Sequence, residues 1–371
     1  MKVGKKNTCA DGKIGLSKEQ QSPDNGGPTG TFWRGRVQWL WQQASNRGLR
    51  VALGTGFSLL FLWLAFRDVS ISQIVAAFGQ VDWRFVALAL GLVLMSHLAR
   101  AARWKLLYHP DQKKLNFLRL TEVLFISQML NIVSPVRLGE VARIYFMSHL
   151  EARSRARTLG TIAVEKWLDI LTLLVLMLLV PVSVSLPAWF QDSKGSLAAL
   201  AIAFFGATLI LSFAKNRLLV LLESTSRFLP ENWRARLRQA VSLALGSLDV
   251  LRSPWVGFRL QGWSFLIWSL GVLVNYVVFL ALGLSLPFAA ALFLLVVLQV
   301  GVVVPSAPGE LGVFNYLCVL ALATFGVGKS IALSYSVLLY LVAFGPILLL
   351  GASFIWWEGI RERRVKPAAH G

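Results

Sequence analysis

Several charged residues lie inside or beside long apolar segments, where a charge is costly and is usually kept for function. Arg137, Glu140 and Arg143 are spaced at three-residue intervals, so they share one broad face if this segment is helical. Glu165 and Asp169 stand four residues apart in a later apolar segment and share a face there. Each such charge costs roughly 2.5–3.5 kcal/mol on membrane-insertion scales. The pattern predicts a functional or structural ion cluster.

Arginines near the membrane surface can hold a phosphate through two parallel hydrogen bonds. Buried carboxylates could balance those arginines, or exchange protons with them during a transport cycle. A purely structural alternative stays open: Arg137 and Arg143 pair with Glu165 and Asp169 and hold the helices together.

Arg100 and Arg103 stand one helical turn apart at the end of an apolar segment. They are candidates for substrate binding, or they only extend to phosphates at the membrane surface. Asn131 and Glu310 flank two breaks in the apolar pattern and complete the candidate set. Three further polar residues in apolar segments are expected to serve packing or hydrogen bonding between helices: His97, Asn275 and Gln299.

The amino-acid composition indicates whether these segments lie in water or in a membrane. Of the 371 residues, 56% are hydrophobic and only 15% charged, against roughly 25% charged in soluble domains. Cys9 and Cys318 are the two cysteines and lie far apart, which argues against a disulfide scaffold or structural zinc site. These figures exclude an ordinary soluble enzyme and predict an all-α polytopic membrane protein.

The apolar runs define nine stretches, several of them long enough to span a membrane. The expected segments are Leu49–Phe66, Phe85–Leu107, Leu118–Val133, Leu159–Val184, Leu197–Ala214, Leu260–Leu286, Phe288–Val304, Leu311–Gly326 and Ile331–Trp357. Residues 1–48 are expected to form a flexible basic tail, 49–357 a single transmembrane domain and 358–371 a second basic tail. Segment 215–259 is polar, with an amphipathic helix over 233–251 expected at the membrane surface.

The net charge of +19 is explained by topology. Of the 37 Lys and Arg residues, 32 fall in the segments 1–50, 100–119, 137–157, 215–259 and 357–371. Basic residues concentrate on the cytoplasmic side of membrane proteins, so both termini are expected to be cytoplasmic. Nucleic-acid binding is not expected.

This charge distribution predicts two re-entrant hairpins. Residues 118–150 must begin and end on the cytoplasmic side, and residues 288–326 on the opposite side. Each hairpin contains the pattern P-x-x-x-G-E, with Pro135 and Gly139 in the first copy and Pro305, Pro308 and Gly309 in the second. A plain span that breaks the charge rule is the alternative for the first hairpin. Oppositely oriented repeats with broken helices are typical of transporters, and we expect about eight transmembrane helices in all.

The motifs resemble those of the lysylphosphatidylglycerol synthase transmembrane-region family, whose members are often called flippase-like. The similar stretches are Asn131–Arg143, Arg100–Trp104, Glu165–Asp169 and Pro305–Phe314. The resemblance implies a helical bundle that flips isoprenoid-phosphate-linked or aminoacylated lipids, or assists enzymes that use them. Many members carry Gly where Glu310 stands and Glu where Asn315 stands. No soluble synthase domain follows the last span, so synthase activity is not expected.

The leading hypothesis is translocation of an anionic lipid headgroup through a cavity lined by broken helices. The alternatives are a membrane-embedded headgroup or glycosyl transferase, a small-solute transporter, and a non-catalytic partner of an envelope-biosynthesis enzyme. No metal, cofactor or catalytic residue is expected, and the resemblance implies a bacterial cell membrane. Membrane lipids are the expected partners.

Overall fold

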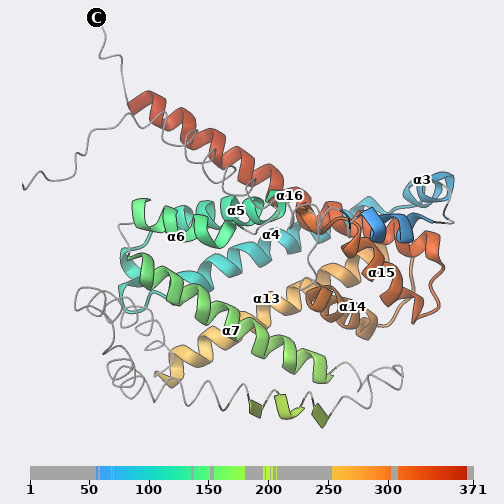
Figure 1. Ribbon diagram of the computed structural model, residues 1–371, viewed down its shortest axis with the longest axis horizontal. Helices are drawn as coiled ribbons and strands as arrows, with labels where there is room; N and C mark the ends of the chain where they lie inside the picture. The colour runs from blue at the N-terminus through green and yellow to red at the C-terminus, as the bar shows by residue number, and fades with distance from the viewer. Residues whose placement is uncertain are drawn as a thin grey trace, which may run out of the picture.

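The computed structural model describes residues 59–67, 71–134, 138–150, 154–179, 253–301 and 308–365, together with isolated positions near 56, 69 and 195–206. Throughout these residues the regular elements are helices (Figure 1). The predictions for Pro135, Arg137, Pro305, the tail 1–48 and the amphipathic segment 233–251 fall outside the described residues. Most of the expected span Leu197–Ala214 does as well.

The first half of the described fold contains two long helices separated by two short ones. After the short helix α3 (Ile71–Gly79) come α4 (Trp83–Leu106), the 3-10 turn η1 (Asp111–Lys114), α5 (Phe117–Val133), α6 (Gly139–Leu150) and α7 (Arg155–Leu179). Two of these helices begin at side-chain caps, where Asp82 accepts from the Arg84 N–H and Asn116 from the Leu118 N–H, both at 2.9 Å. Such caps satisfy N–H groups that have no partner within the helix.

The second half has the same order of long and short elements. It consists of α13 (Pro254–Ala281), α14 (Phe288–Gly301), the 3-10 turn η4 (Pro308–Glu310), α15 (Val313–Ala323) and α16 (Lys329–Val365). In both halves two short helices therefore lie between two long ones. The order of elements is that of the expected repeat, and the opposite orientation of its two copies stays a prediction.

Three of the long helices have the length and apolarity needed to cross a bilayer. They cover Trp83–Leu106, Trp255–Ala281 and Lys329–Trp357. The short helices of the two pairs have 17, 12, 14 and 11 residues, fewer than the roughly 20 of a full span. A multi-pass helical membrane protein is thus confirmed, whereas the number of crossings and the re-entrant paths stay predictions.

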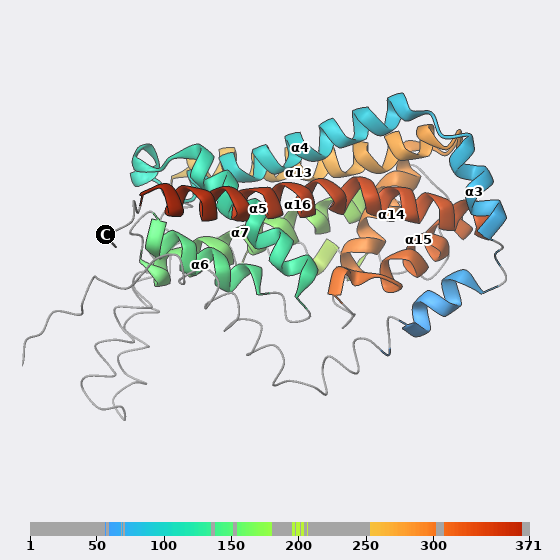
Figure 2. The same ribbon diagram turned by 90° about the horizontal axis from the view of Figure 1, so that it is seen from above.

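Helices α4 and α13 lie side by side and run in opposite directions (Figure 2). The Asp82 N–H, at the start of α4, donates to the carbonyl of Ala281, at the end of α13, at 2.9 Å. Near the other end, Arg103 of α4 contacts Ser264 of α13. Apolar side chains from α4, α13, α14, α15 and α16 join in one buried core.

Each short pair is held together by close packing. Gly139 opens α6 against α5: its N–H donates to Asn131 Oδ1 at 2.6 Å, and a Cβ at this position would lie 2.0 Å from the Ser127 carbonyl oxygen. Only glycine permits this approach. In the second pair a Cβ on Gly301 would lie 1.9 Å from the Leu317 side chain.

The two short pairs also meet each other. Helix α5 packs against η4, and a Cβ on Gly309 would lie 3.8 Å from Ile132 near the end of α5. Helix α5 packs on α16 of the other half, and α14 packs on α7 of the first half. The end of α5 and η4, one from each half, therefore lie against each other.

Helix boundaries follow the apolar runs, but some helices extend further: α7 begins at Arg155 instead of Leu159, and α16 continues to Val365, beyond Trp357. The helix expected from Leu260 begins earlier, at Pro254, because Pro suits the first helical turn and Trp255 and Val256 extend the apolar run. The short helix α3 was not expected, because it lies between two segments interpreted as spans. Of the expected span Leu49–Phe66, the stretch 59–66 is helical.

Candidate functional site

Arg103 is the centre of a buried ion cluster between α4, α7 and α13. Its guanidinium donates to both carboxylate oxygens of Asp169, at 2.5 and 3.2 Å, and to Glu165 at 3.1 Å. It also donates to the Ser264 hydroxyl at 2.8 Å. The Arg103 side chain is 0% exposed. The alternative in which Arg103 extends to the membrane surface is therefore wrong: its side chain is held inward by two carboxylates.

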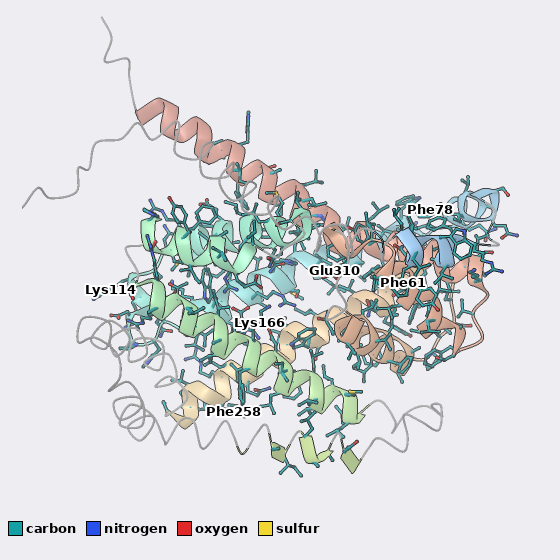
Figure 3. The ribbon with its side chains drawn as sticks, in the orientation of Figure 1. Phe61, Phe78, Lys114, Lys166, Phe258 and Glu310 are labelled. Atoms are coloured by element: carbon teal, nitrogen blue, oxygen red, sulfur yellow. The ribbon has the colours of Figure 1, made fainter. Side chains whose placement is uncertain are left out.

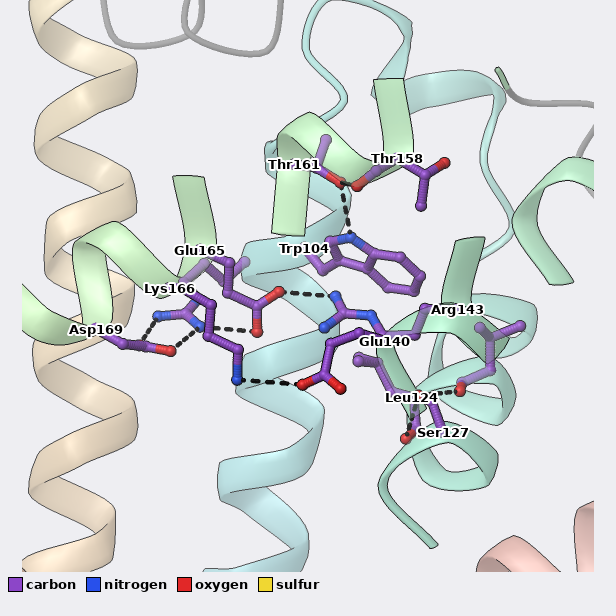
Figure 4. A network of polar contacts seen from close by, with 12 residues as sticks. Trp104, Leu124, Ser127, Glu140, Arg143, Thr158, Thr161, Glu165, Lys166 and Asp169 are labelled. Atoms are coloured by element: carbon purple, nitrogen blue, oxygen red, sulfur yellow. Dashed lines mark hydrogen bonds and ion pairs between the residues drawn. The ribbon is translucent and has the colours of Figure 1, made fainter. Parts of the chain in front are cut away.

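Arg143 of α6 completes the cluster from the other side (Figure 4). It donates to the second oxygen of Glu165 at 2.7 Å, and its guanidinium carbon lies 4.0 Å from the ring centre of Trp104. The Trp104 indole in turn donates to Thr161 at 3.3 Å. A guanidinium over an aromatic face is stabilised by the ring quadrupole, so Trp104 fixes the position of Arg143.

The cluster has equal numbers of positive and negative charges, and most of its polar atoms already have hydrogen-bond partners. It contains two arginines, Arg103 and Arg143, and two carboxylates, Glu165 and Asp169, all buried. The Trp268 indole donates to Asp169 at 3.0 Å, which further engages that carboxylate. The Nε atoms of both arginines are its buried nitrogens without a hydrogen bond. An incoming anion would have to displace one of the carboxylates to bind here.

A second ion pair lies beside the cluster and is more accessible. Lys166 Nζ lies 3.6 Å from a carboxylate oxygen of Glu140, and the lysine side chain is 59% exposed. Figure 3 shows Lys166 and Glu310 toward the middle of the bundle. Asn131 takes no part in either ion pair, because its oxygen caps the start of α6 at Gly139.

Arg100 has a different environment from Arg103, although the two are neighbours on α4. Three residues rotate a helix by about 300°, so the two side chains point about 60° apart. Arg100 is half-buried and lies 5.6 Å from the ring centre of Trp268. It lines a cavity of about 180 Å³ that is bounded by α4, α13, α14, α15, α16 and η4. In the part of the chain that the structure describes, its guanidinium has no ion pair.

Glu310 lines the same cavity from η4. Its φ is +58°, which is the left-handed region that costs a residue with a Cβ roughly 1–2 kcal/mol. Gly309 before it has φ +78°. The backbone conformation would suit Gly at position 310, so the sequence retains a carboxylate here at a conformational cost. Such strain is a reason to look for a function.

The remaining predicted polar residues line the cavity or stabilise helix contacts. Asn275 donates to the Ala291 carbonyl at 3.2 Å, as expected of a hydrogen bond between helices, and Gln299 lines the cavity. His97 bonds the Val93 carbonyl and Gln128 through its two ring nitrogens. Asn315, at a family position, donates to Ser336 at 2.9 Å and caps Gly312.

Sequence reasoning missed the aromatic residues of the site. Trp268 contacts both Asp169 and Arg100, and it lies in an apolar run that gives no signal of its role. Trp104 was noted only as a neighbour of the arginines. In the described segments no group of three or more His, Cys, Asp or Glu residues is placed to hold a metal ion.

Sequence comparison finds known proteins that are similar to this chain. The chain is 23% identical over 328 residues to a UPF0104 membrane protein of Pyrococcus horikoshii, covering 83% of this chain and 96% of that protein. It is 26% identical over 306 residues to a UPF0104 membrane protein of Methanothermobacter thermautotrophicus, covering 77% and 89%. It is 24% identical over 299 residues to the glycosyltransferase AglD of Haloferax volcanii, covering 72% of this chain but 48% of that protein.

A family model described as the lysylphosphatidylglycerol synthase TM region matches residues 51–351, which include every described residue of the ion cluster and of the cavity. The matched range is most of the chain. The chain therefore belongs to the lysylphosphatidylglycerol synthase transmembrane-region family.

Proposed function

We propose that this protein moves an anionic lipid headgroup across the membrane while the lipid tails stay in the bilayer. The observation that carries the proposal is the cavity between the long helices α4, α13 and α16 and the second short pair, lined by Arg100 and Glu310. Trp268 and Asn275, which line it, lie well inside the apolar span Trp255–Ala281. Charged side chains at membrane depth mark substrate pathways more often than not.

The arrangement of the helices supports alternating access. The two halves have the same order of long and short helices, and η4 of the second half packs on α5 of the first. In transporters with inverted repeats, substrates bind near the midplane between broken helices, and one repeat rocks against the other. The balanced cluster of Arg103, Arg143, Glu165 and Asp169 would hold α4, α6 and α7 together during such a motion.

The proposal includes a topology in which both termini are cytoplasmic. Lys114, at the end of η1, lies at the end of the bundle opposite Phe61 and Phe78 (Figure 3). Arg157 bonds Asp111 at 2.8 Å there. Under the positive-inside rule this is the cytoplasmic end.

The test is a translocation assay in proteoliposomes. Labelled polyprenyl-phosphate and aminoacyl-phospholipid probes are placed in the outer leaflet, and their loss of accessibility to an external reagent is followed. We expect faster loss than in protein-free liposomes, abolished by Arg137→Ala. If folded protein moves none of these probes, translocation is refuted.

A second candidate is a lipid-linked glycosyl transferase. It is favoured by the relative that bears the name glycosyltransferase AglD. That relative is about twice as long as the aligned region, so the transferase chemistry could belong to its remaining part. Transfer of labelled sugar from a nucleotide donor to lipid by the purified chain would favour this candidate over translocation.

A further inference from the structure

Trp268 separates the ion cluster from the cavity. Its side chain lies on α13, is 5% exposed and lines the cavity. The indole N–H donates to a carboxylate oxygen of Asp169 at 3.0 Å, so this carboxylate lies at the edge of the ring. The guanidinium carbon of Arg100 lies over the ring, 5.6 Å from its centre. One indole therefore contacts an anion of the cluster and a cation of the cavity.

The geometry of α13 fixes the place of this indole. Ser264 and Trp268 stand four residues apart and so share one face of the helix. Ser264 accepts a hydrogen bond from Arg103 at 2.8 Å, while Trp268 donates one to Asp169. Two such contacts, one turn apart, fix the rotation of α13 relative to α4 and α7. The Trp268 ring is thereby held against the cavity.

Arg100 and Arg103 are stabilised in two different ways. Arg103 donates hydrogen bonds to Glu165 and Asp169, so its terminal nitrogens are already used. Arg100 faces the Trp268 ring instead. The ring quadrupole attracts the positive charge as a whole, and this attraction does not require an N–H donor. Among the described residues none accepts a hydrogen bond from the Arg100 guanidinium, so its donors stay available for an anion.

The hydrogen bond to Asp169 strengthens the contact between the Trp268 ring and the cation. An N–H group that donates to an ionised carboxylate makes a strong, charge-assisted hydrogen bond. In an interior of low dielectric constant such bonds polarise the groups that make them, and here electron density shifts toward the indole ring. A more negative ring face attracts Arg100 more strongly. Asp169 thus supports the charge of Arg100 through the indole, without pairing with it directly.

We infer that Trp268 is a positioning residue that keeps Arg100 turned toward the cavity, with its hydrogen-bond donors available, and prevents it from pairing with Asp169. This inference rests on the proposed function, in which Arg100 contacts the translocated anion. Trp268 acts through Arg100: it supplies a negative ring face for the cation and fills the space between the cation and the carboxylate.

The concentration dependence of translocation tests this role. Initial rates per folded protein are measured in proteoliposomes over a range of mole fractions of the labelled probes. Trp268→Leu removes the ring and should raise the half-saturating probe fraction about tenfold. Trp268→Phe keeps a ring but loses the hydrogen bond to Asp169, so it should raise this fraction about threefold. Trp255→Leu, at the exposed start of the same helix, is the matched control and should leave it unchanged.

The chemical reactivity of Arg100 tests the same inference without transport. The purified full chain in detergent is treated with phenylglyoxal, and modification of each arginine is followed by peptide mass spectrometry. In the wild-type chain Arg100 should react faster than Arg103, whose donors are engaged. In Trp268→Leu the modification of Arg100 should slow severalfold, because an ion pair with Asp169 protects it. The exposed Arg84 is the internal reference.

Unchanged reactivity of Arg100 in a folded Trp268→Leu variant, or a half-saturating fraction equal to that of the wild type, would overturn the inference. So would slower modification of Arg100 than of Arg103 in the wild-type chain. If Trp268→Leu does not fold, the half-saturating fraction of Trp268→Phe decides the question, and a wild-type value refutes the role. If the wild-type chain moves no probe, the proposed function fails, while the reactivity of Arg100 still decides whether Trp268 positions it.

Discussion

Removal of one charge from the buried cluster should lower the free energy of unfolding of the bundle. Asp169 accepts two hydrogen bonds from Arg103, at 2.5 and 3.2 Å, and one from Trp268. Asp169→Asn keeps the size of the side chain but leaves two arginines facing one carboxylate. Because Arg103 is 0% exposed, water cannot compensate the excess charge. Breaking such a buried pair costs about 3–5 kcal/mol.

A double-mutant cycle distinguishes this electrostatic cause from a loss of packing. Arg103→Met alone leaves two carboxylates facing Arg143 and should also cost about 3–5 kcal/mol. The double variant restores the balance, since Glu165 and Arg143 remain paired at 2.7 Å. We therefore expect its cost to fall below the sum of the single costs by about 2 kcal/mol or more.

The free energy of unfolding can be compared by reversible titration with dodecyl sulfate in mixed micelles, followed by tryptophan fluorescence. Lys114→Met is the control, because Lys114 is 75% exposed and its ion pair with Asp111 is at the surface. Such pairs contribute about 0–1 kcal/mol. If Asp169→Asn is as stable as the control, or if the two cluster substitutions are additive, the electrostatic account of the cluster is refuted.

Four other predictions follow from particular positions. Gly139→Ala should destabilise the fold and lower its thermal transition, because the added Cβ would lie 2.0 Å from the Ser127 carbonyl oxygen; an unchanged transition would contradict the close approach. Glu310→Gly should raise stability by about 1 kcal/mol through relief of the left-handed conformation while it lowers translocation, and a loss of stability would contradict the strain. A reporter enzyme fused after Arg157 should read cytoplasmic, whereas an external reading would refute the inverted repeat. Arg137→Ala and Glu140→Ala should each abolish translocation but preserve monodisperse elution; full activity in both would make the first helix pair structural.

The apolar runs predicted much of the fold because a span must be long and apolar whatever its neighbours are. Expected and observed bounds agree closely for α4, for α5 and for the start of α14. The helix periodicity also predicted that Glu165 and Asp169 share a face, and the structure confirms that both contact Arg103.

The partners of these charges could not be predicted, because they depend on contacts between distant segments. Arg103 and Asp169 are 66 residues apart, and Trp268 is another 99 residues beyond Asp169. Arg100 and Arg103 appeared equivalent in sequence, yet a 60° difference in direction places one against the cavity and the other in the cluster. Asn131 was a candidate ligand, and only the fold shows that its oxygen caps Gly139.

The most direct test of the account asks whether a headgroup crosses the membrane through the cavity. Gly271 of α13 lines the cavity, and Gly262 of the same helix has open space where its side chain would be. Initial translocation rates of the labelled polyprenyl-phosphate and aminoacyl-phospholipid probes in proteoliposomes should therefore be compared for the wild-type chain, Gly271→Leu and Gly262→Leu. We predict that filling the cavity with Gly271→Leu lowers the rate at least tenfold, while Gly262→Leu matches wild type. Equal rates for the two folded variants, or a wild-type rate no greater than in protein-free liposomes, would contradict the account.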